Sequence, residues 1–199
     1  MSPPLRTLVL DGSPSPAGGS RRLAAAMLEV FGGEADIIRL YDSPVRPCRG
    51  CGGCAADPVC ALDGDLADFP ERLAGADCLL IVSPIHFASL SAPLIAFFSR
   101  LQPFWRARRR GRDLLARRPG QSALAASGGS DYPGMFAPAR AVAAAVAKTL
   151  SIPFAGLAAA AGTDRLPVAE NPAALAAAAR LATEMLAAVR QKAGGGQEV

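Results

Sequence analysis

The chain has few of the features that mark membrane or secreted proteins. No apolar run in its 199 residues reaches the roughly 18 residues that a membrane span needs. The first four residues lead directly into an apolar segment, which leaves no room for a signal peptide. We therefore expect a cytoplasmic protein without a membrane partner.

Lysine is also scarce, because only Lys148 and Lys192 occur among the 21 basic residues. The formal net charge of +4 therefore rests on arginine. Together with the heavy use of alanine, this suggests coding bias rather than a nucleic-acid interface. We expect no nucleic-acid partner.

The composition and the order of segments predict an α/β protein. With 51% hydrophobic residues the chain can fill one sizeable core, so we expect a single domain over residues 1–192 and a flexible tail at 193–199. Expected strands cover 5–10, 35–40, 77–82, 122–127 and 152–158, and expected helices cover 21–31, 66–74, 136–150 and 171–192. This alternation predicts a doubly wound, five-stranded parallel sheet with helices on both faces. The apolar third strand should be central and the mixed second strand should lie at an edge.

The first loop lacks both common nucleotide-binding signatures. It has neither the G-K-[S/T] ending of an NTP-binding loop nor the G-x-G-x-x-G spacing of a dinucleotide fold. A strand, a loop of small residues and a helix N-terminus nevertheless form an anion site, with Ser20 as the expected N-cap and Ser13 and Ser15 as further donors. A phosphate monoester bound without lysine suits flavin mononucleotide (FMN). The alternative is an ordinary turn between a strand and a helix.

Four of the five cysteines lie close together after the second expected strand. Cys48, Cys51, Cys54 and Cys60 have the spacing C-x2-C-x2-C-x5-C, with glycines between the first three. Thiolates spaced in this way can converge on one centre, because glycine lets the backbone fold back. Cys78 lies within an apolar strand and is expected to be a buried core residue.

Three interpretations of the clustered cysteines remain open. A structural disulfide pair is disfavoured in a reducing cytoplasm. Zinc needs four such ligands, although paired C-x2-C knuckles are its more usual pattern. A 4Fe-4S cluster accommodates three cysteines at successive short spacings.

Three motifs together resemble a known family. They are L-x-G-S-P at 10–14, P-C-x-G-C-x2-C-x5-C at 47–60, and S-P-I-x-F followed by A-P-L at 83–94. In this order they resemble the flavodoxin-like, NAD(P)H-dependent FMN reductases, most closely the iron–sulfur flavoprotein branch. The resemblance covers about the first 135 residues. It implies a flavodoxin-like FMN-binding domain with a Cys-rich loop, 47–61, inserted after the second strand, and NAD(P)H as electron donor.

The resemblance also implies which residues bind the cofactors. The FMN phosphate would lie on the first loop, at Ser13, Pro14, Ser15, Gly18, Gly19 and Ser20. The isoalloxazine ring would lie against Ser83, Pro84, Ile85, His86 and Phe87, and would be flanked by the loop that contains Ser127, Gly128 and Gly129. Cys48, Cys51, Cys54 and Cys60 would ligate a 4Fe-4S cluster.

The chain departs from the usual family pattern at several positions. Ser15 and Gly19 replace an arginine and an asparagine of the first loop, and His86 replaces a tyrosine. In the helix after the third strand, Ile95 and Ser99 replace a lysine and an aspartate, whereas the arginine that follows is kept. His86 is the only histidine, and a stacking or polar contact is a commoner role for it than acid–base catalysis.

These observations predict an FMN-dependent oxidoreductase that passes electrons from NAD(P)H to a small acceptor such as a quinone or free flavin. No catalytic side chain is expected, because the hydride chemistry belongs to the flavin. The alternative is a non-enzymatic electron carrier or redox sensor. A homodimer or homotetramer is expected, because the apolar segment at 85–105 is larger than one flavin would cover.

Overall fold

The computed structural model describes residues 4–43, 45–56, 59–60, 64 and 67–194. Its five strands form one parallel sheet in the order β2-β1-β3-β4-β5. The strands are β1 (Thr7–Asp11), β2 (Ala35–Arg39), β3 (Cys78–Pro84), β4 (Gln121–Ser127) and β5 (Phe154–Ala160). The predicted flavodoxin-like, doubly wound fold is therefore confirmed, with β3 in the centre and β2 at an edge.

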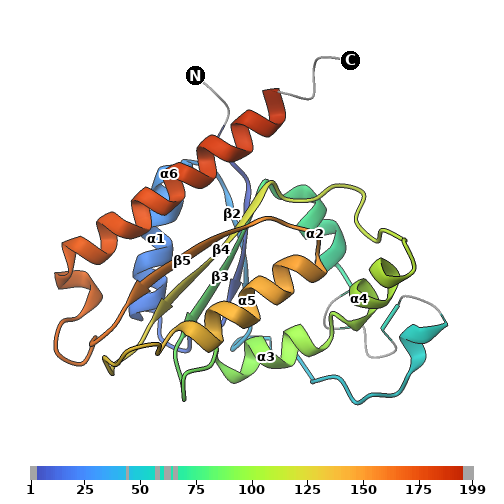
Figure 1. Ribbon diagram of the computed structural model, residues 1–199, viewed down its shortest axis with the longest axis horizontal. Coiled ribbons are helices and arrows are strands. Elements are labelled where there is room, and N and C mark those ends of the chain that lie inside the picture. Colours follow the sequence, from blue (N-terminus) through green and yellow to red (C-terminus); the bar gives the residue numbers. More distant parts are fainter. Residues whose placement is uncertain (1–3, 44, 57–58, 61–63, 65–66, 195–199) are drawn as a thin grey trace.

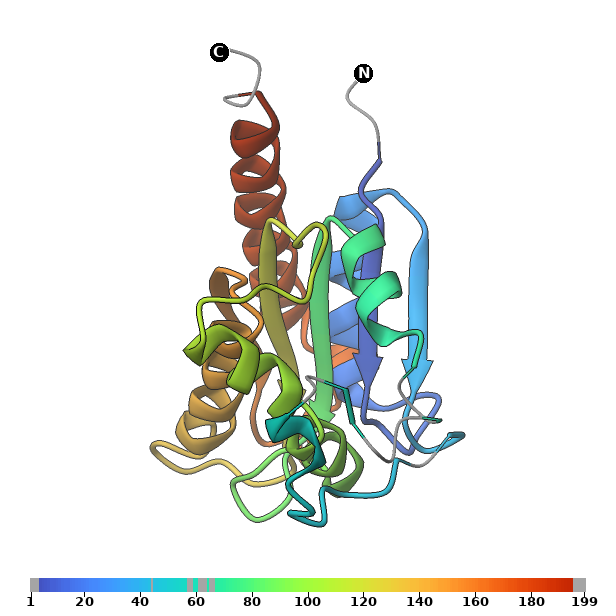
Figure 2. The same ribbon diagram turned by 90° about the vertical axis from the view of Figure 1, so that its right-hand side faces the viewer.

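Helices cover both faces of the sheet, as Figures 1 and 2 show. They are α1 (Gly19–Phe31), α2 (Phe69–Gly75), α3 (Ala92–Ser99), α4 (Gln102–Arg109), α5 (Ala137–Thr149) and α6 (Pro172–Gly194). One core cluster lies between the sheet and α1 with α6, and the other lies between the sheet and α2, α3 and α5.

The central strand feeds both cores because successive strand residues point to opposite faces. Leu79 and Ile81 belong to the cluster with α2, α3 and α5, whereas Leu80 and Val82 belong to the cluster with α1 and α6. All four side chains are fully or almost fully buried. This burial on both faces explains why the strand is a continuous apolar run rather than an alternating one.

Helix α6 differs from the sequence-based expectation in two respects. It continues to Gly194, so the first residues of the predicted tail are helical, and residues 195–199 lie outside the described residues. By length and composition alone it could also cross a membrane, since residues 172–192 have a mean hydropathy of 1.3. The reason is its alanine content. Its buried stripe, Ala174, Ala178, Ala182 and Met185, packs against α1 and β5 in the core.

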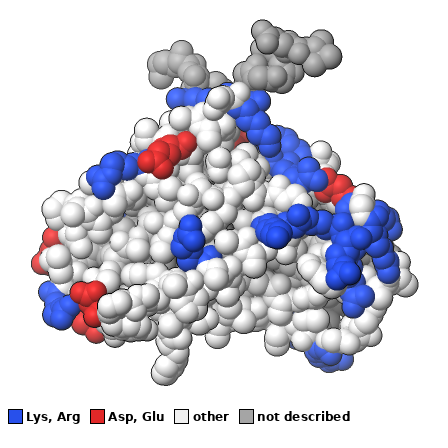
Figure 3. All heavy atoms as spheres, viewed as in Figure 1, with Lys and Arg blue, Asp and Glu red and all other residues white. Residues whose placement is uncertain are grey.

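The basic segment at 106–118 begins inside a helix that was not expected from the sequence. Residues 102–109 form α4, which buries Pro103 and Ala107 and turns Arg108 and Arg109 to solvent. Figure 3 shows arginine and lysine gathered on this side of the molecule, over α4 and the segment that follows it.

Candidate functional site: two loops joined by helix α3

The loops that follow β1 and β3 are each bonded to the neighbouring strand at the carboxyl edge of the sheet. The Gly12 N–H donates to Val82 O at 2.8 Å, and the Ile85 N–H donates to Ser127 O at 2.8 Å. A Cβ on Gly12 would lie 2.4 Å from Ser91 Oγ, so the first loop packs directly against the start of α3. Ligands of open α/β sheets bind at this edge, beside the point where the strand order reverses.

The start of α1 offers donors to an anion. Its N-cap is Gly18, and no side chain caps it. Ser20, expected to be the N-cap, instead lies inside the first turn and is 1% exposed. Its Oγ has no hydrogen-bond partner among the described residues. The N-cap prediction is wrong because the helix starts at Gly19, two residues before the expected start at 21, but the shift leaves the first-turn N–H groups and this hydroxyl for a ligand.

Close packing explains the glycines at the N-cap and at the first position of this helix. A Cβ on Gly18 would lie 2.8 Å from Ser13 Oγ, and a Cβ on Gly19 would lie 2.7 Å from Val168 Cγ2 and 3.0 Å from Ser127 Oγ. The backbone at the start of α1 therefore lies directly against Ser127 at the end of β4 and against Val168 after β5. Both loops that the sequence assigned to one flavin are adjacent in the structure.

An ion pair that the sequence analysis missed fixes the first loop. Asp11 is 4% exposed, and its Oδ2 lies 2.8 Å from Arg21 Nε. Asp11 Oδ1 accepts the Ser13 N–H at 2.9 Å, and Arg21 donates to Ser13 O at 2.8 Å. The pair neutralises the buried carboxylate beside the anion site. The signal was present in the sequence, as an aspartate that ends the first strand and an arginine in the first turn of the helix.

Ser83, predicted to contact the flavin ring, uses its hydroxyl inside the protein. The side chain is fully buried, donates to Pro84 O at 2.7 Å and accepts the Ser91 N–H at 2.9 Å. Ser83 therefore ties the loop after β3 to the start of α3. The other residues of this loop are half-buried or exposed, so a ligand can contact them. They are Pro84, Ile85, His86 and Phe87.

The turn after β3 is strained. His86 and Ser89 exchange two backbone hydrogen bonds of 3.0 and 2.9 Å, which forces Phe87 and Ala88 to φ values of +50° and +59°. Residues other than glycine rarely adopt such values, and strained backbone tends to cluster at functional sites. The Phe87 side chain projects fully into solvent, with a relative exposure of 105%.

The third predicted ring loop is packed on both sides. A Cβ on Gly128 would meet Met135 Cε at 2.7 Å, and a Cβ on Gly129 would meet Asp164 Oδ2 at 2.4 Å. Asp164, on the loop after β5, was not singled out from the sequence. It places a carboxylate against the backbone of this loop.

The four clustered cysteines line one cavity of about 140 Å³. Cys48 and Cys51 are exposed, and Cys54 and Cys60 are half-buried. Gly50 and Gly52, between them, have φ values of +66° and +78°, which only glycine adopts without strain. Figures 1 and 2 both show the cysteine segment beside α4. The described lining of the cavity also contains Arg49, Arg100, Gln102, Pro103 and Arg106.

The end of α3 holds both ends of this cysteine loop. Ser99 Oγ accepts the Cys48 N–H at 2.9 Å, and Arg100 Nε donates to Cys60 Sγ at 3.1 Å. The Gly50 N–H donates to Cys48 Sγ at 3.4 Å. Within the described residues, no three His, Cys, Asp or Glu side chains stand close enough to hold a single metal ion. The thiols thus surround a cavity without converging on one point.

Cys78 is separate from this group, as the sequence predicts. It is fully buried in β3, and burial, with a smaller contribution from the Asp77 charge, raises the pKa of its thiol to about 12. It is a core residue with no access to the cavity.

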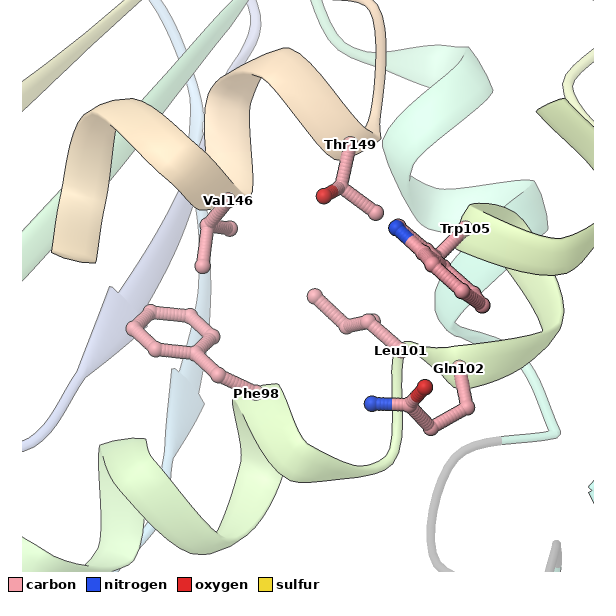
Figure 4. A pocket seen from close by; sticks show the side chains of 6 residues that line it. All are labelled: Phe98, Leu101, Gln102, Trp105, Val146 and Thr149. Atoms are coloured by element: carbon pink, nitrogen blue, oxygen red, sulfur yellow. The ribbon is translucent and has the colours of Figure 1, made fainter. Parts of the chain in front are cut away.

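A second cavity, of about 150 Å³, lies between α3, α4 and α5 (Figure 4). Phe98, Trp105 and Val146 point into it, with Leu101, Gln102 and Thr149. Phe97, by contrast, packs edge-on against Phe69 within the core, with ring centroids 5.0 Å apart. Phe97 therefore belongs to the core, whereas Phe98 and Trp105 line the cavity between the helices.

Helix α3 connects the two candidate sites. Ser91 at its start contacts the loops after β1 and β3, and Ser99 and Arg100 at its end hold the cysteine loop. Eight residues at 1.5 Å each separate the two ends by about 12 Å.

Comparison with known proteins identifies a family. The family model described as NADPH-dependent FMN reductase matches residues 5–162. The iron–sulfur flavoprotein of Methanosarcina thermophila is 30% identical over 94 residues, which are 46% of this chain and 49% of that protein. An iron–sulfur flavoprotein of Methanocaldococcus jannaschii is 29% identical over 102 residues, 50% of this chain and 53% of that protein. The chain thus spans about half the length of the curated relatives it matches.

Solved structures support the fold. The NAD(P)H:quinone oxidoreductase of Methanothermobacter marburgensis superposes with a TM-score of 0.70 at 16% identity, covering 90% of this chain and 95% of that one. An FMN-dependent NADH-azoreductase of Bacillus anthracis, solved with FMN, gives a TM-score of 0.63 at 14% identity, covering 90% and 99%.

Proposed function

The chain belongs to the NADPH-dependent FMN reductase family, and from this membership we propose that it is an FMN-dependent oxidoreductase. Electrons would pass from NAD(P)H through the flavin to a small acceptor such as a quinone or free flavin. The quinone oxidoreductase and azoreductases with the same fold support this class of acceptor without identifying it.

The observation that carries the proposal is the uncapped start of α1. It combines first-turn N–H groups that no described side chain caps, a buried Ser20 hydroxyl without a described partner and two tightly packed glycines. A phosphate would satisfy these donors and is favoured by the helix dipole. In our proposal Ser13, Pro14, Ser15, Gly18, Gly19 and Ser20 form this phosphate site.

The remaining residues would orient the ring of the flavin. Pro84, Ile85, His86 and Phe87 would lie along it, with Ser83 fixing their backbone from behind. Ser127, Gly128 and Gly129 would flank it. Bound FMN supplies the hydride chemistry, so we assign no catalytic side chain.

We further propose that the cysteine cavity holds a 4Fe-4S cluster ligated by Cys48, Cys51, Cys54 and Cys60. Four thiols spread around one cavity suit a cluster, whose ligands bind different irons, better than a single ion. Arg106 Nε is buried beside the cavity with no described hydrogen-bond partner, which is suited to an anionic group. The names of the iron–sulfur flavoproteins add support. A bound cluster would supply one-electron chemistry next to the two-electron flavin.

Turnover tests the reductase proposal. The FMN-loaded chain should oxidise NADPH or NADH in the presence of a quinone or free flavin, followed by the loss of nicotinamide absorbance. Failure with both donors, although the flavin is bound, would contradict it. The competing function, an electron carrier or redox sensor, would then be favoured, and the surface position of Cys48 and Cys51 suits it.

Assembly and location complete the proposal. We propose a single domain and at least a homodimer in the cytoplasm. Ile95 and Trp105, which are 39% and 44% exposed, lie on the helices of one face and suit a subunit interface. A monomeric mass in light scattering at working concentration would contradict the homodimer.

A further inference from the structure

Two arginines, Arg100 and Arg106, lie beside the cysteine cavity, where their charge would act on the redox properties of the proposed cluster. Arg100 is 2% exposed, although it lies at the end of a surface helix. Its Nε lies 3.1 Å from Cys60 Sγ, and its NH1 donates to Arg46 O at 3.0 Å. Arg100 thus directs one N–H at a thiol of the cavity and another at the backbone of the segment that leads into the cysteine loop.

The second arginine is Arg106, from α4. It is half-buried and lines the same cavity, and its Nε has no hydrogen-bond partner among the described residues. No acidic side chain occurs in the described lining, whereas Arg49, Arg100 and Arg106 do. The described part of the lining therefore gathers positive charge around four sulfur atoms.

We infer that Arg100 is a positioning residue, which holds Cys60 for ligation and, with Arg106, sets the reduction potential of the cluster. This inference rests on the proposed cluster. One-electron reduction adds a negative charge to the cluster. A nearby guanidinium stabilises the reduced form more than the oxidised form, and N–H donation to a ligand sulfur acts in the same direction. Both arginines should therefore raise the potential.

The test compares midpoint potentials in anaerobic titrations with dithionite, read from cluster absorbance and electron paramagnetic resonance. Arg100→Gln keeps an N–H donor but removes the charge, and we expect a shift to a more negative potential. Arg106→Gln should give a smaller shift in the same direction. Arg109→Gln is the control, because Arg109 is exposed on the same helix, stacks on Trp105 and does not line the cavity. It should leave the potential unchanged.

Wild-type iron content separates the two proposals. A wild-type chain that takes up no iron on anaerobic reconstitution contradicts the cluster itself. A wild-type chain with about four irons, and an Arg100→Gln variant with the same potential, overturns the inference alone. An equal shift in Arg109→Gln overturns it as well, because the effect would then be one of net charge.

If Arg100→Gln binds FMN but no iron, its potential cannot be measured, and Arg100→Lys then tests the role of the charge. Lysine keeps the charge without the guanidinium geometry, and we expect it to restore iron uptake at least in part. A lysine variant as empty of iron as the glutamine variant, with FMN still bound, would overturn the electrostatic role.

Discussion

The two loops at the ends of α3 are built in opposite ways. The phosphate loop, residues 12–20, is bonded to β3 and fixed by the Asp11–Arg21 pair, with glycines packed against neighbouring loops. The cysteine loop is held by Ser99 and Arg100, its Gly50 and Gly52 face open space, and two of its four cysteines are exposed.

The two loops should therefore differ in how much they must be ordered when a ligand binds. The phosphate loop has its donors arranged before any ligand binds, so little ordering is needed on binding. The cysteine loop has its ligands around a cavity but not converged, so binding and local ordering should be coupled. The two loops should therefore respond independently to substitution.

The largest expected effect separates the loops completely. Cys54→Ser should abolish the broad cluster absorption and the bound iron while FMN stays bound, because the phosphate loop shares no residue with the cavity. Cys78→Ala, in the core, is the control and should keep both cofactors. Full iron content in the Cys54 variant would contradict the four-cysteine assignment.

Thiol reactivity should sharpen the contrast between the cavity and the core. The pKa of about 12 for Cys78, against an ordinary 9.0, lowers its thiolate fraction at pH 8 by about a thousandfold. Iodoacetamide should label the four loop cysteines of the folded, metal-free chain and reach Cys78 only after unfolding, as mass spectrometry would show. Rapid labelling of Cys78 in the folded chain would be inconsistent with its burial.

The same pKa gives a dependence of stability on pH. The folded pKa of Cys78 is raised, so its contribution is fully present below pH 9 and declines as the pH rises from 9 towards 12, where only the unfolded thiol ionises.

Flavin affinity tests the phosphate loop. FMN should bind at least about 100-fold more tightly than riboflavin, because the donors at the start of α1 contact only the phosphate. Ser20→Ala should weaken FMN about tenfold and leave riboflavin unchanged, measured by quenching of flavin fluorescence. Thr183→Ala, on exposed α6 surface, is the matched hydroxyl control. Equal affinities for the two flavins would remove the loop from the site.

The smallest effect concerns the strained turn. Ala88→Gly should raise the free energy of unfolding by roughly 0.5–1 kcal/mol. Glycine removes the backbone strain of a φ of +59°, and this gain outweighs the added entropy of the unfolded chain. Ala145→Gly, exposed within α5, should lower it by about 1 kcal/mol. Urea denaturation measures both. A destabilised Ala88→Gly variant would argue against strain in this turn.

The strands were predictable because their signal is local. The apolar run at Cys78–Val82 is long enough to identify a central strand without any partner. Helix α4 was missed because its apolar face is short and Pro103 with several arginines resembles a loop. Ser20 was placed one residue outside its helix because serine is a common N-cap, whereas packing against Ser127 and Val168 set the true start.

The long-range contacts that hold the two loops in place were less predictable than the loops themselves. The contacts of Ser99 with Cys48 and of Arg100 with Cys60 span 51 and 40 residues, and no local pattern encodes them. The Asp11–Arg21 pair likewise depends on the turn between strand and helix. Sequence spacing thus suggested which residues could bind, and the structure adds what holds them in place.

We propose that one chain holds FMN at one end of α3 and an iron–sulfur cluster at the other. The most direct test is anaerobic reconstitution with FMN, iron and sulfide, followed by analysis of flavin, iron and zinc per chain. We expect about one FMN and about four irons in the same chain, with a broad visible absorption beneath the flavin bands. Stoichiometric zinc in place of iron, or iron without bound FMN, would contradict it.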